Sequence, residues 1–173
     1  HPTKEDWDAY YKKRDCIYCG QCITHCPVGA IEAVGEYENA KIPFEKKKEG
    51  KVIIAQIAPS VRTSIGEDFS MPYGSIVTEQ LIGALKVLGA DKVFDVSLGS
   101  DLTTVEEAKE LVERIKEKRD LPMFTSCCPG WVRFLELYYP DFIPNLTTVR
   151  SPHIILGGLV KTYWAEKEKI DPK

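Results

Sequence analysis

Residues 52–58 read VIIAQIA, a run of apolar and mostly β-branched side chains that predicts a buried strand, and Pro59 ends it. Two later apolar runs, residues 93–98 and 121–125, predict further strands. Apolar residues at helical spacing predict helices over residues 74–88, 101–118, 130–139 and 152–167. The alternation predicts an α/β fold, with a parallel sheet lobe, flanking helices and right-handed crossovers. Functional residues of such sheets gather beyond the carboxyl ends of the strands, which here are residues 59–60, 99–100 and 126–128.

The composition restricts the class of protein. The chain has 173 residues, of which 43% are hydrophobic and 28% charged, and its formal net charge is -3. These values are typical of a globular protein with one moderate core, and the mild acidity argues against a nucleic-acid partner. No apolar run is long enough for a membrane span. We expect a cytoplasmic location. Because residue 1 is His rather than Met, we expect a fragment, a processed product or a trimmed chain, and the absence of a visible targeting signal therefore carries little weight.

Four of the six cysteines form one tight motif, C-x-x-C-x-x-C-x-x-x-C-P, at Cys16, Cys19, Cys22 and Cys26. This spacing is that of bacterial ferredoxins, in which three thiolates bind three corners of a 4Fe–4S cluster and the fourth thiolate ligates another cluster. A zinc site or four structural thiols are the alternatives, although zinc sites usually separate their CxxC pairs. The motif therefore predicts iron–sulfur binding by these cysteines.

The motif supplies only part of a two-cluster domain. The remaining ligands of both clusters are absent, so we expect the other half of the domain upstream of His1 or on another chain. A single cluster with one non-protein ligand is the alternative. Residues 1–13 predict a linker or a short helix, and the charged stretch KIPFEKKKEGK at residues 41–51 predicts a domain boundary. A solvated loop inside one domain is the alternative interpretation of that stretch. We predict a partial ferredoxin-like module with its linker at residues 1–45 and an α/β lobe at residues 46–173.

The other two cysteines are adjacent in TSCCPGW, residues 125–131, at a predicted strand tip just before a predicted helix. A helix N-terminus favours the thiolate form of a cysteine. The residues alone leave three roles open, namely a metal ligand beside a reactive thiol, a strained vicinal disulfide, or two buried small side chains. We rank the ligand beside a reactive thiol first.

The chain resembles the catalytic subunit of iron-only (FeFe) hydrogenases. The resemblance runs in order through CIYCGQCITHCPVGAI at residues 16–31, APSVRTSIGEDF at 58–69, FDVSLGSDLTTVEEAKELVERI at 94–115, PMFTSCCPGWVRF at 122–134 and YYPDFIPNLTTVRSP at 138–152. It implies that residues 46–173 are the first, incomplete lobe of an H-cluster domain. The implied cofactors are 4Fe–4S clusters and the H-cluster, a 4Fe–4S cubane linked to a di-iron centre with CO and CN ligands.

The resemblance also implies individual roles. Cys128 matches a ligand of the cubane, and Cys127 matches the thiol that passes protons to and from the di-iron half. The family's proton path matches Glu107, Glu110 and Thr147, and Thr keeps the hydroxyl that is often Ser there. By helical spacing alone both glutamates would face solvent. Residues that match the walls of the diatomic-ligand pocket are Ala58, Pro59, Ser60, Ser151, Pro152 and His153, the last of which stands where the family usually carries Gln.

The implied function is the reversible reduction of protons to H2, with electrons entering through 4Fe–4S clusters from ferredoxin or another electron carrier. This chain supplies only Cys128 of the H-cluster ligands, so we expect the C-terminal lobe and the upstream cluster half elsewhere in a longer chain or as separate chains. Two alternatives stay open. One is an H2-sensing regulatory relative, for which His153 is a distinguishing residue. The other is an iron–sulfur assembly relative without the di-iron centre, against which the intact Cys127 argues.

Overall fold

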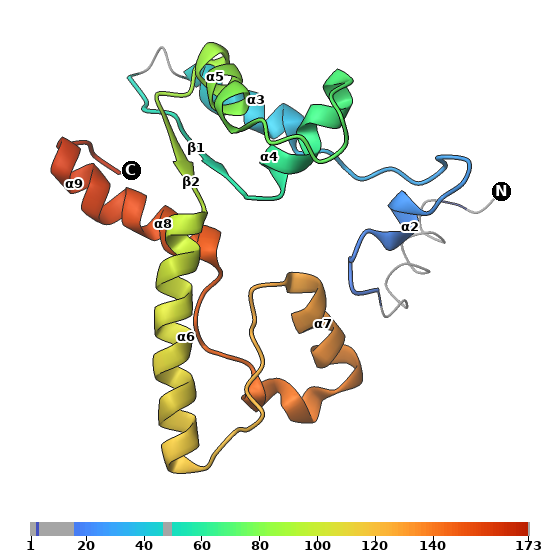
Figure 1. Cartoon of the computed structure of the whole chain (residues 1–173), viewed down its shortest axis with the longest axis vertical. Helices are drawn as coiled ribbons and strands as arrows, with labels where there is room; N and C mark the ends of the chain where they lie inside the picture. The colour runs from blue at the N-terminus through green and yellow to red at the C-terminus, as the bar shows by residue number, and fades with distance from the viewer. Residues whose placement is uncertain (1–2, 4–15, 47–49, 173) are drawn as a thin grey trace. The chain divides into compact units, whose positions relative to one another are not determined.

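The computed structural model describes residues 3, 16–46 and 50–172, apart from the side chain of Lys46. Their contacts divide the chain into two compact units (Figure 1). Unit 1 comprises His1–Ala33 and Leu111–Thr148, and unit 2 comprises Val34–Glu110 and Val149–Lys173. The linker or helix predicted at residues 1–13 lies outside the described residues, Thr3 excepted. The sequence division at residues 45 and 46 stays a prediction.

Unit 2 contains a two-stranded parallel sheet, which confirms the predicted fold class. Strand β1 (Ile54–Ile57) pairs with β2 (Lys92–Asp95), with Ile54 opposite Lys92 and Ile57 opposite Asp95. Helix α5 (Thr78–Leu88) lies between them in the sequence, as predicted, and Gly89 ends it with a φ of 117°. The amides of Gly89 and Ala90 bond the last carbonyls of α5, the usual ending of a helix at a left-handed glycine.

Unit 2 contains further helices that lie before, between and after the two strands in the sequence. They are α3 (Tyr37–Lys46), α4 (Val61–Ser64), the 3-10 helix η2 (Ile65–Phe69), and α8 (Pro152–Leu159), which continues through the π turn η4 (Val160–Trp164) into α9 (Ala165–Glu168). This last run confirms the helix predicted at 152–167. Trp164 meets Phe94 of β2 edge to face, with ring centroids 5.8 Å apart. The buried apolar side chains are Ile53, Ile57, Val77, Ala90, Leu156, Val160 and Ala165.

Helix α6 (Ser97–Glu117) begins four residues earlier than predicted and contributes to both units. The predicted strand at 93–98 ends at Asp95 because the Asp95 carboxylate accepts the amide of Ser97 at 2.8 Å and starts the helix there. The early start places Gly99 inside the helix and against α8. A Cβ on Gly99 would lie 2.2 Å from the carbonyl oxygen of Pro152, so only glycine permits this approach.

Unit 1 contains α2 (Gln21–Thr24), α7 (Pro129–Tyr138) and the 3-10 helix η3 (Pro140–Asn145). The helix predicted at 130–139 is confirmed, but the strand predicted at 121–125 is not formed. Phe124 makes only an isolated parallel bridge with Leu146. Pro122 lacks the amide hydrogen that a longer ladder would need. A half-exposed aromatic cluster surrounds this bridge and comprises Phe124, Trp131, Phe134, Tyr138, Tyr139 and Phe142.

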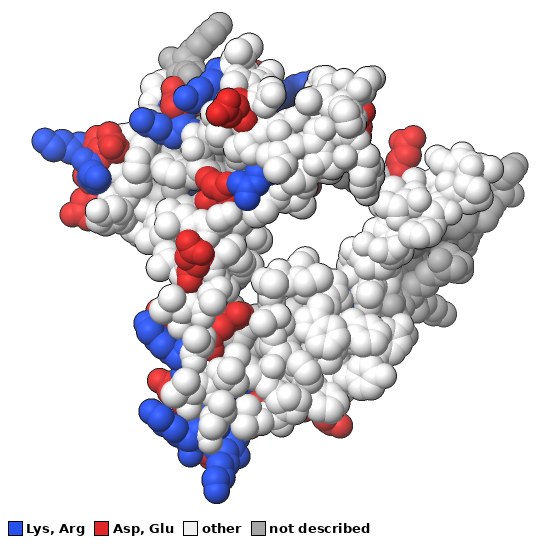
Figure 2. Space-filling view, viewed as in Figure 1, with Lys and Arg blue, Asp and Glu red and all other residues white. Residues whose placement is uncertain are grey.

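The described surface mixes charges of both signs, and Figure 2 shows acidic side chains close to basic ones on the face in view. Lys109 pairs with Glu106 at 2.6 Å, and Arg119 lies 3.0 Å from Asp120. Within the described residues, no helix combines the length and the apolar content that a bilayer crossing requires.

Candidate functional site

The turn after β1 holds three of the predicted pocket residues. The amide of Val61 bonds the Ala58 carbonyl at 3.1 Å, which closes a turn over Pro59 and Ser60. The Ser60 carbonyl accepts the hydroxyls of Thr63 at 3.0 Å and Ser64 at 2.9 Å. Pro59 and Ser60 are exposed at the strand tip, as the sheet rule predicts, and the turn is fixed by hydroxyls of the short helix that follows.

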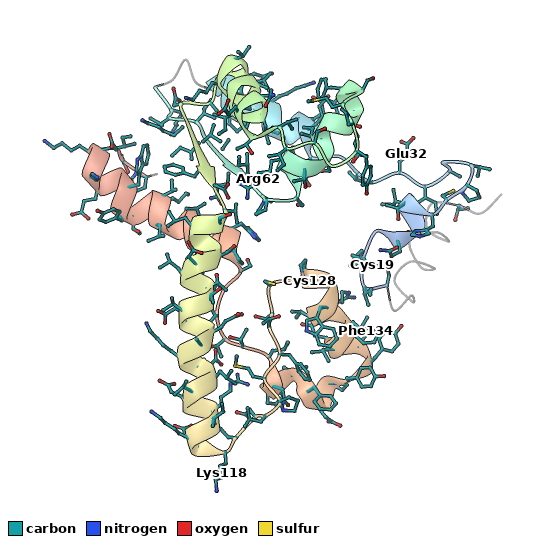
Figure 3. All side chains as sticks on the ribbon, in the orientation of Figure 1. Cys19, Glu32, Arg62, Lys118, Cys128 and Phe134 are labelled. Carbon is teal, nitrogen blue, oxygen red and sulfur yellow. The ribbon has the colours of Figure 1, made fainter. Side chains whose placement is uncertain are left out.

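An ion pair that sequence reasoning missed joins this turn to the end of β2. Arg62 (labelled in Figure 3) donates to Asp95, whose other oxygen accepts the Ser97 amide at 2.8 Å. The hydrogen bonds from Ser97, together with the Arg62 charge, lower the pKa of Asp95. One carboxylate therefore ties the tip of β1 to the start of α6. The available signal was an acidic residue inside a predicted strand, two residues before a serine.

The start of α8 holds the other predicted pocket residues. Ser151 precedes the helix, Pro152 is its first residue, and the Ser151 hydroxyl lies 3.2 Å from Nδ1 of His153. The carbonyl of Pro152 faces Gly99 of α6 at the close approach described above. His153 is exposed. The His153 imidazole, in contact with the Ser151 hydroxyl, is thus the polar group at the position where the resemblance leads us to expect the amide of Gln.

Both predicted relay glutamates lie on the unit 2 part of α6. Glu107 and Glu110 are each partly buried rather than fully solvated, which helical spacing alone did not predict. Burial raises the pKa of Glu107, and the nearby charge of Glu110 raises it further. A carboxyl with a raised pKa holds a proton more readily than a solvated one, which suits a group that passes protons.

Cys127 and Cys128 are both free thiols, so the vicinal disulfide left open by the sequence is not formed. Both are exposed. Cys128 directly precedes α7, Pro129 is the first helical residue, and the Cys128 carbonyl accepts the amide of Val132 at 3.1 Å. Proline at this position is preorganised for the helix, so the Cys128 thiol is presented at a helix N-terminus as predicted.

Thr147 lies beside the segment that leads to Cys127. Its side chain is buried at 5% exposure, and its amide bonds the Phe124 carbonyl at 2.8 Å. The hydroxyl of Ser126 donates to the Thr147 carbonyl at 3.0 Å. The structure therefore brings the predicted relay hydroxyl and the predicted reactive thiol into adjoining segments of one unit.

Arg114 is a second residue that sequence reasoning missed. It is only 2% exposed, and its guanidinium donates to the carbonyls of Asp120 at 3.2 Å, Pro144 at 3.2 Å and Leu146 at 2.7 Å. The charge thus holds the segment that carries Thr147. In the sequence it stands in ERIKEKR, which is typical of a solvated helix end and carries no signal of burial.

The N-terminal cysteine loop provides sulfur acceptors for backbone amides. The Cys26 sulfur accepts the amide of Ala30 at 3.2 Å, and the Cys16 sulfur accepts the amide of Tyr18 at 3.4 Å. Amides of Val28 and Ala30 lower the pKa of the Cys26 thiol. The thiolate is the form that binds iron, so these residues fit an iron–sulfur cluster by their donor chemistry.

The predicted ligands are not all gathered in the structure. Within residues 16–46 and 50–172, no three His, Cys, Asp or Glu side chains stand close enough to share one metal ion. The assignment of individual ligands stays a prediction. Cys19, Cys128 and Phe134, which are labelled in Figure 3, line one apolar cavity of about 390 Å³ in unit 1 together with Tyr18 and Trp131.

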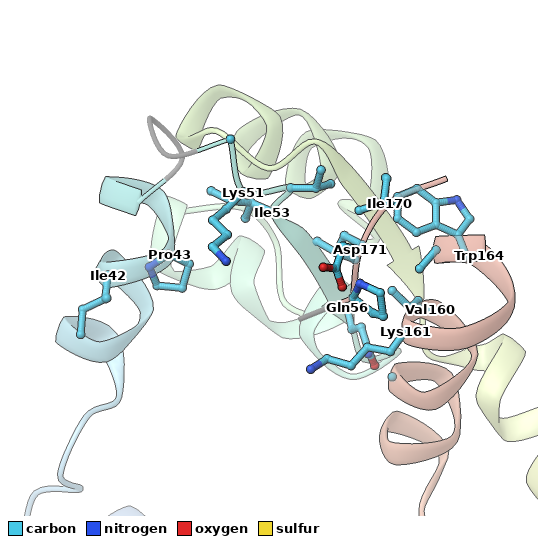
Figure 4. Close-up of a pocket in the computed structure, with 16 residues that line it drawn as sticks. Ile42, Pro43, Lys51, Ile53, Gln56, Val160, Lys161, Trp164, Ile170 and Asp171 are labelled. Atoms are coloured by element: carbon cyan, nitrogen blue, oxygen red, sulfur yellow. The ribbon is translucent and has the colours of Figure 1, made fainter. Parts of the chain in front are cut away.

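A larger cavity of about 750 Å³ contains none of the predicted site residues. It lies in unit 2 beside β1, with Ile53, Val160, Lys161, Trp164 and Asp171 among its walls (Figure 4). Cavity size therefore does not identify the chemistry of this chain, which the thiols and the strand tips carry.

Comparison with known proteins adds two family matches. The model described as the C-terminal domain of the iron-only hydrogenase large subunit matches residues 51–173, and a 4Fe–4S binding domain model matches residues 9–32. The second match confirms the 4Fe–4S cofactor predicted from the cysteine spacing. A solved structure of an FeFe-hydrogenase from Chlamydomonas reinhardtii superposes with a TM-score of 0.74 at 41% identity, over 81% of this chain and 36% of that chain.

Three curated relatives show the range of the similarity. Iron hydrogenase 1 of Clostridium pasteurianum is 46% identical over 85% of this chain and 25% of its own length. The periplasmic Fe hydrogenase large subunit of Nitratidesulfovibrio vulgaris is 47% identical over 91% of this chain and 45% of its own length. The human nuclear prelamin A recognition factor is 33% identical over 96% of this chain and 38% of its own length.

The chain thus spans a quarter to just under half of the length of these relatives. The hydrogenase family model alone covers more than half of the chain. The sequence motifs and the fold agree with that family assignment. The chain belongs to the iron-only hydrogenase large subunit family.

Proposed function

We propose that this chain forms part of an iron-only hydrogenase that catalyses 2H⁺ + 2e⁻ ⇌ H2. The observation that carries the proposal is the pair of free, exposed thiols at Cys127 and Cys128, with Cys128 at the start of α7 and Thr147 in the adjoining segment. Two neighbouring thiols can take different tasks, one as an iron ligand and one as a proton carrier. The family assignment favours this division of tasks over two structural thiols.

The residues fit two cofactors. Cys16, Cys19, Cys22 and Cys26 would ligate 4Fe–4S clusters, and Cys128 would supply one ligand of the H-cluster, the cofactor of a similar FeFe-hydrogenase of known structure. When bound, these groups supply one-electron transfer and the iron centre of the hydrogen chemistry. The protein orients them and excludes competing reactions.

The proposed task of the side chains is proton transfer. A thiol can both release and accept a proton, which suits Cys127 for this task. Glu107 holds a proton more tightly than a solvated glutamate because of its burial and the charge of Glu110. The Thr147 hydroxyl can both donate and accept a hydrogen bond, which a group that relays protons must do.

The test uses the complete, maturated protein and two single substitutions at adjacent positions. Infrared spectra of the unsubstituted protein are expected to show CO and CN⁻ bands. Cys127→Ala is expected to abolish H2 turnover and to retain those bands, because it removes only the proton carrier. Cys128→Ala, the matched control, is expected to lose iron. Loss of iron in Cys127→Ala would mean that the two roles are assigned backwards.

A second candidate function is iron–sulfur cluster assembly without a di-iron centre. It is favoured by the relative named cytosolic Fe-S cluster assembly factor from Xenopus tropicalis, which is 29% identical over 91% of this chain. The hydrogenase relatives are more similar, at 46% and 47% identity. Absence of CO and CN⁻ bands from the maturated protein would favour assembly. Bands with very low turnover would favour an H2-sensing role, in which His153 would be the first residue to exchange for Gln.

We also propose the partners and the location. A hydrogenase of this family needs the remaining H-cluster ligands and an electron carrier, for which ferredoxin is our candidate. A cytoplasmic location remains our proposal, and fractionation of cells that produce the full protein would test it. Reduced ferredoxin should support H2 evolution by the complete protein. Failure with ferredoxin and success with an artificial low-potential donor would point to another carrier.

A further inference from the structure

A single arginine of α7 contacts the N-terminal cysteine loop at two points. The Nε–H of Arg133 donates to the carbonyl of Cys16 at 3.0 Å. Its guanidinium also lies over the ring of Tyr18, 5.4 Å from the centroid. The two contacts join residues that are more than a hundred positions apart in the sequence but belong to the same compact unit.

The first turn of α7 approaches the same loop closely. A Cβ on Gly130 would lie 3.4 Å from the carbonyl oxygen of Ile17 and 3.9 Å from both the Cα of Cys19 and the sulfur of Cys128. An alanine would therefore just fit, whereas a larger β-branched side chain would push the loop away. Cys19 and Cys128 also line the same apolar cavity. Gly130 is thus a point where the loop and the helix start lie close together.

The charge of Arg133 has only a weak ionic partner on its own helix. Its side chain is 41% exposed, and its ion pair with Glu136 is long at 4.0 Å. A contact of this kind contributes little to global stability because solvent screens it. The directional bond from Arg133 to a carbonyl and its planar stacking nevertheless set the position of the loop.

We propose that Arg133 and Gly130 form a clamp that positions the Cys16–Cys19 loop against the start of α7, and so sets how readily single electrons pass between the iron–sulfur sites at the two motifs. This proposal rests on the proposed function for its electron-transfer part. No bond forms or breaks in the transfer. Both residues are positioning residues, since neither carries a sulfur ligand.

The first measurement is amide hydrogen exchange of residues 16–20 in the complete apoprotein. Arg133→Gln removes the charge, the Nε donor and the planar face, and is expected to speed exchange of this loop roughly three- to tenfold. Arg119→Gln is the matched control, because Arg119 is similarly exposed and pairs instead with Glu117 and Asp120. It should leave exchange of residues 16–20 unchanged. Equal exchange in Arg133→Gln and Arg119→Gln would overturn the clamp.

The second measurement separates electron delivery from hydrogen chemistry in the loaded protein. H2 evolution driven by an external donor needs electrons to cross from the N-terminal cluster, whereas H2/D⁺ isotope exchange at the active centre needs no net electron transfer. Arg133→Gln is expected to slow donor-driven evolution several-fold and to leave isotope exchange unchanged. An equal fall in both rates would place Arg133 in the hydrogen chemistry and contradict a positioning role.

Two further variants separate position from charge. Gly130→Val should displace the loop with Arg133 intact and reproduce the slow donor-driven rate, whereas Gly130→Ala should behave as the parent. Arg133→Lys keeps the charge but loses the fork and the stacking face, so a full rescue by Lys would show that charge alone matters and would overturn the positional claim. If the parent protein made no H2, the proposed function would fail, while amide exchange would still decide whether the clamp exists.

Discussion

Each of the two compact units is stabilised internally by a different kind of interaction. In unit 2, the buried side chains are apolar, with Thr103 as the polar exception in the described part of that unit. In the described part of unit 1, the buried set is Leu135, Arg114 and Thr147, of which two are polar. Burial of apolar area is non-directional, whereas a hydrogen bond to a carbonyl specifies one position. In unit 1, which carries the thiols, directional hydrogen bonds therefore fix the positions of segments, and the apolar core is small.

The contrast extends to how each unit brings distant segments together. Unit 2 joins α6 to α8 by close helix packing, with Gly99 against the Pro152 carbonyl and Leu156. Unit 1 joins its segments by side chains that reach carbonyls, namely those of Arg114, Ser126 and Arg133. Loops without regular structure leave carbonyls to be satisfied, and long donors satisfy them. Substitutions in each unit can test this difference.

Leu156→Ala should produce the largest loss of stability because Leu156 is 1% exposed at the centre of unit 2. We expect the free energy of unfolding to fall by about 2–5 kcal/mol, from lost transfer energy and the cavity left behind. Urea denaturation of the assembled apoprotein measures it. Leu88→Ala, at a position that is 66% exposed, is the control and should cost far less. Similar losses at both positions would refute the apolar core of unit 2.

Arg114→Met should show that unit 1 depends on a buried charge. It leaves the carbonyls that Arg114 serves without their donor, and we expect a loss of about 3 kcal/mol. Amide exchange at Thr147 should rise as well, because the Leu146 carbonyl loses its partner. Arg119→Met, at an exposed arginine of the same unit, should change the unfolding energy by less than about 0.5 kcal/mol. If the Arg114→Met protein were as stable as the parent, unit 1 would not depend on the hydrogen bonds of its buried arginine.

Gly99→Ala should disturb the packing of α6 on α8, since the added Cβ would overlap the Pro152 carbonyl. We expect a loss of about 1–3 kcal/mol, as for other overpacked sites. Gly83→Ala is the matched control: a Cβ there meets nothing within 4 Å, so this helical substitution should stabilise by about 0.5–1 kcal/mol. Opposite signs at the two glycines, read from the same denaturation curves, are the expected result. Equal signs would contradict the close approach.

Glu107→Gln should have the smallest effect, and one that depends on pH. The raised pKa means that folding favours the protonated carboxyl, so its unfavourable contribution is absent well below the ordinary pKa of 4.5 and grows as the pH rises through the folded-state pKa. The substitution should therefore add stability, by no more than about 1 kcal/mol, at neutral pH and not in acid. Glu106→Gln, at an exposed carboxylate of the same helix that pairs with Lys109, is the control. A stability gain that is larger in acid than at neutral pH would contradict the raised pKa of Glu107.

Much of the fold could be predicted because local patterns agree with it. The parallel strands, α5, α7 and the helix after Pro152 follow from apolar spacing and from proline and glycine signals. The third predicted strand failed because an apolar run is necessary but not sufficient for a ladder, and Pro122 interrupts the donors. The early start of α6 was missed because the apolar run continues past Asp95, whereas in the structure β2 ends at that residue and its carboxylate accepts the Ser97 amide.

Candidate thiols, strand tips and relay residues were all visible as residue types, and the family resemblance supplied roles for them. Arg114, Arg133 and the Arg62–Asp95 pair were not visible. Each acts by contacting a backbone group or a charge that is distant in the sequence, and no periodicity encodes such a contact. Helical spacing also misjudged Glu107 and Glu110, whose partial burial depends on neighbours in the fold.

The amino-acid sequence alone determined the fold class and the 4Fe–4S motif, because apolar periodicity and cysteine spacing are local properties of the chain, and its motifs resemble those of one family. Only the tertiary structure decided that Cys127 and Cys128 are free, that Thr147 adjoins the segment of Cys127, and that Arg133 holds the Cys16 loop. These facts depend on contacts between residues far apart in the chain. Their energies come from packing and hydrogen bonding, which exist only after the chain has folded.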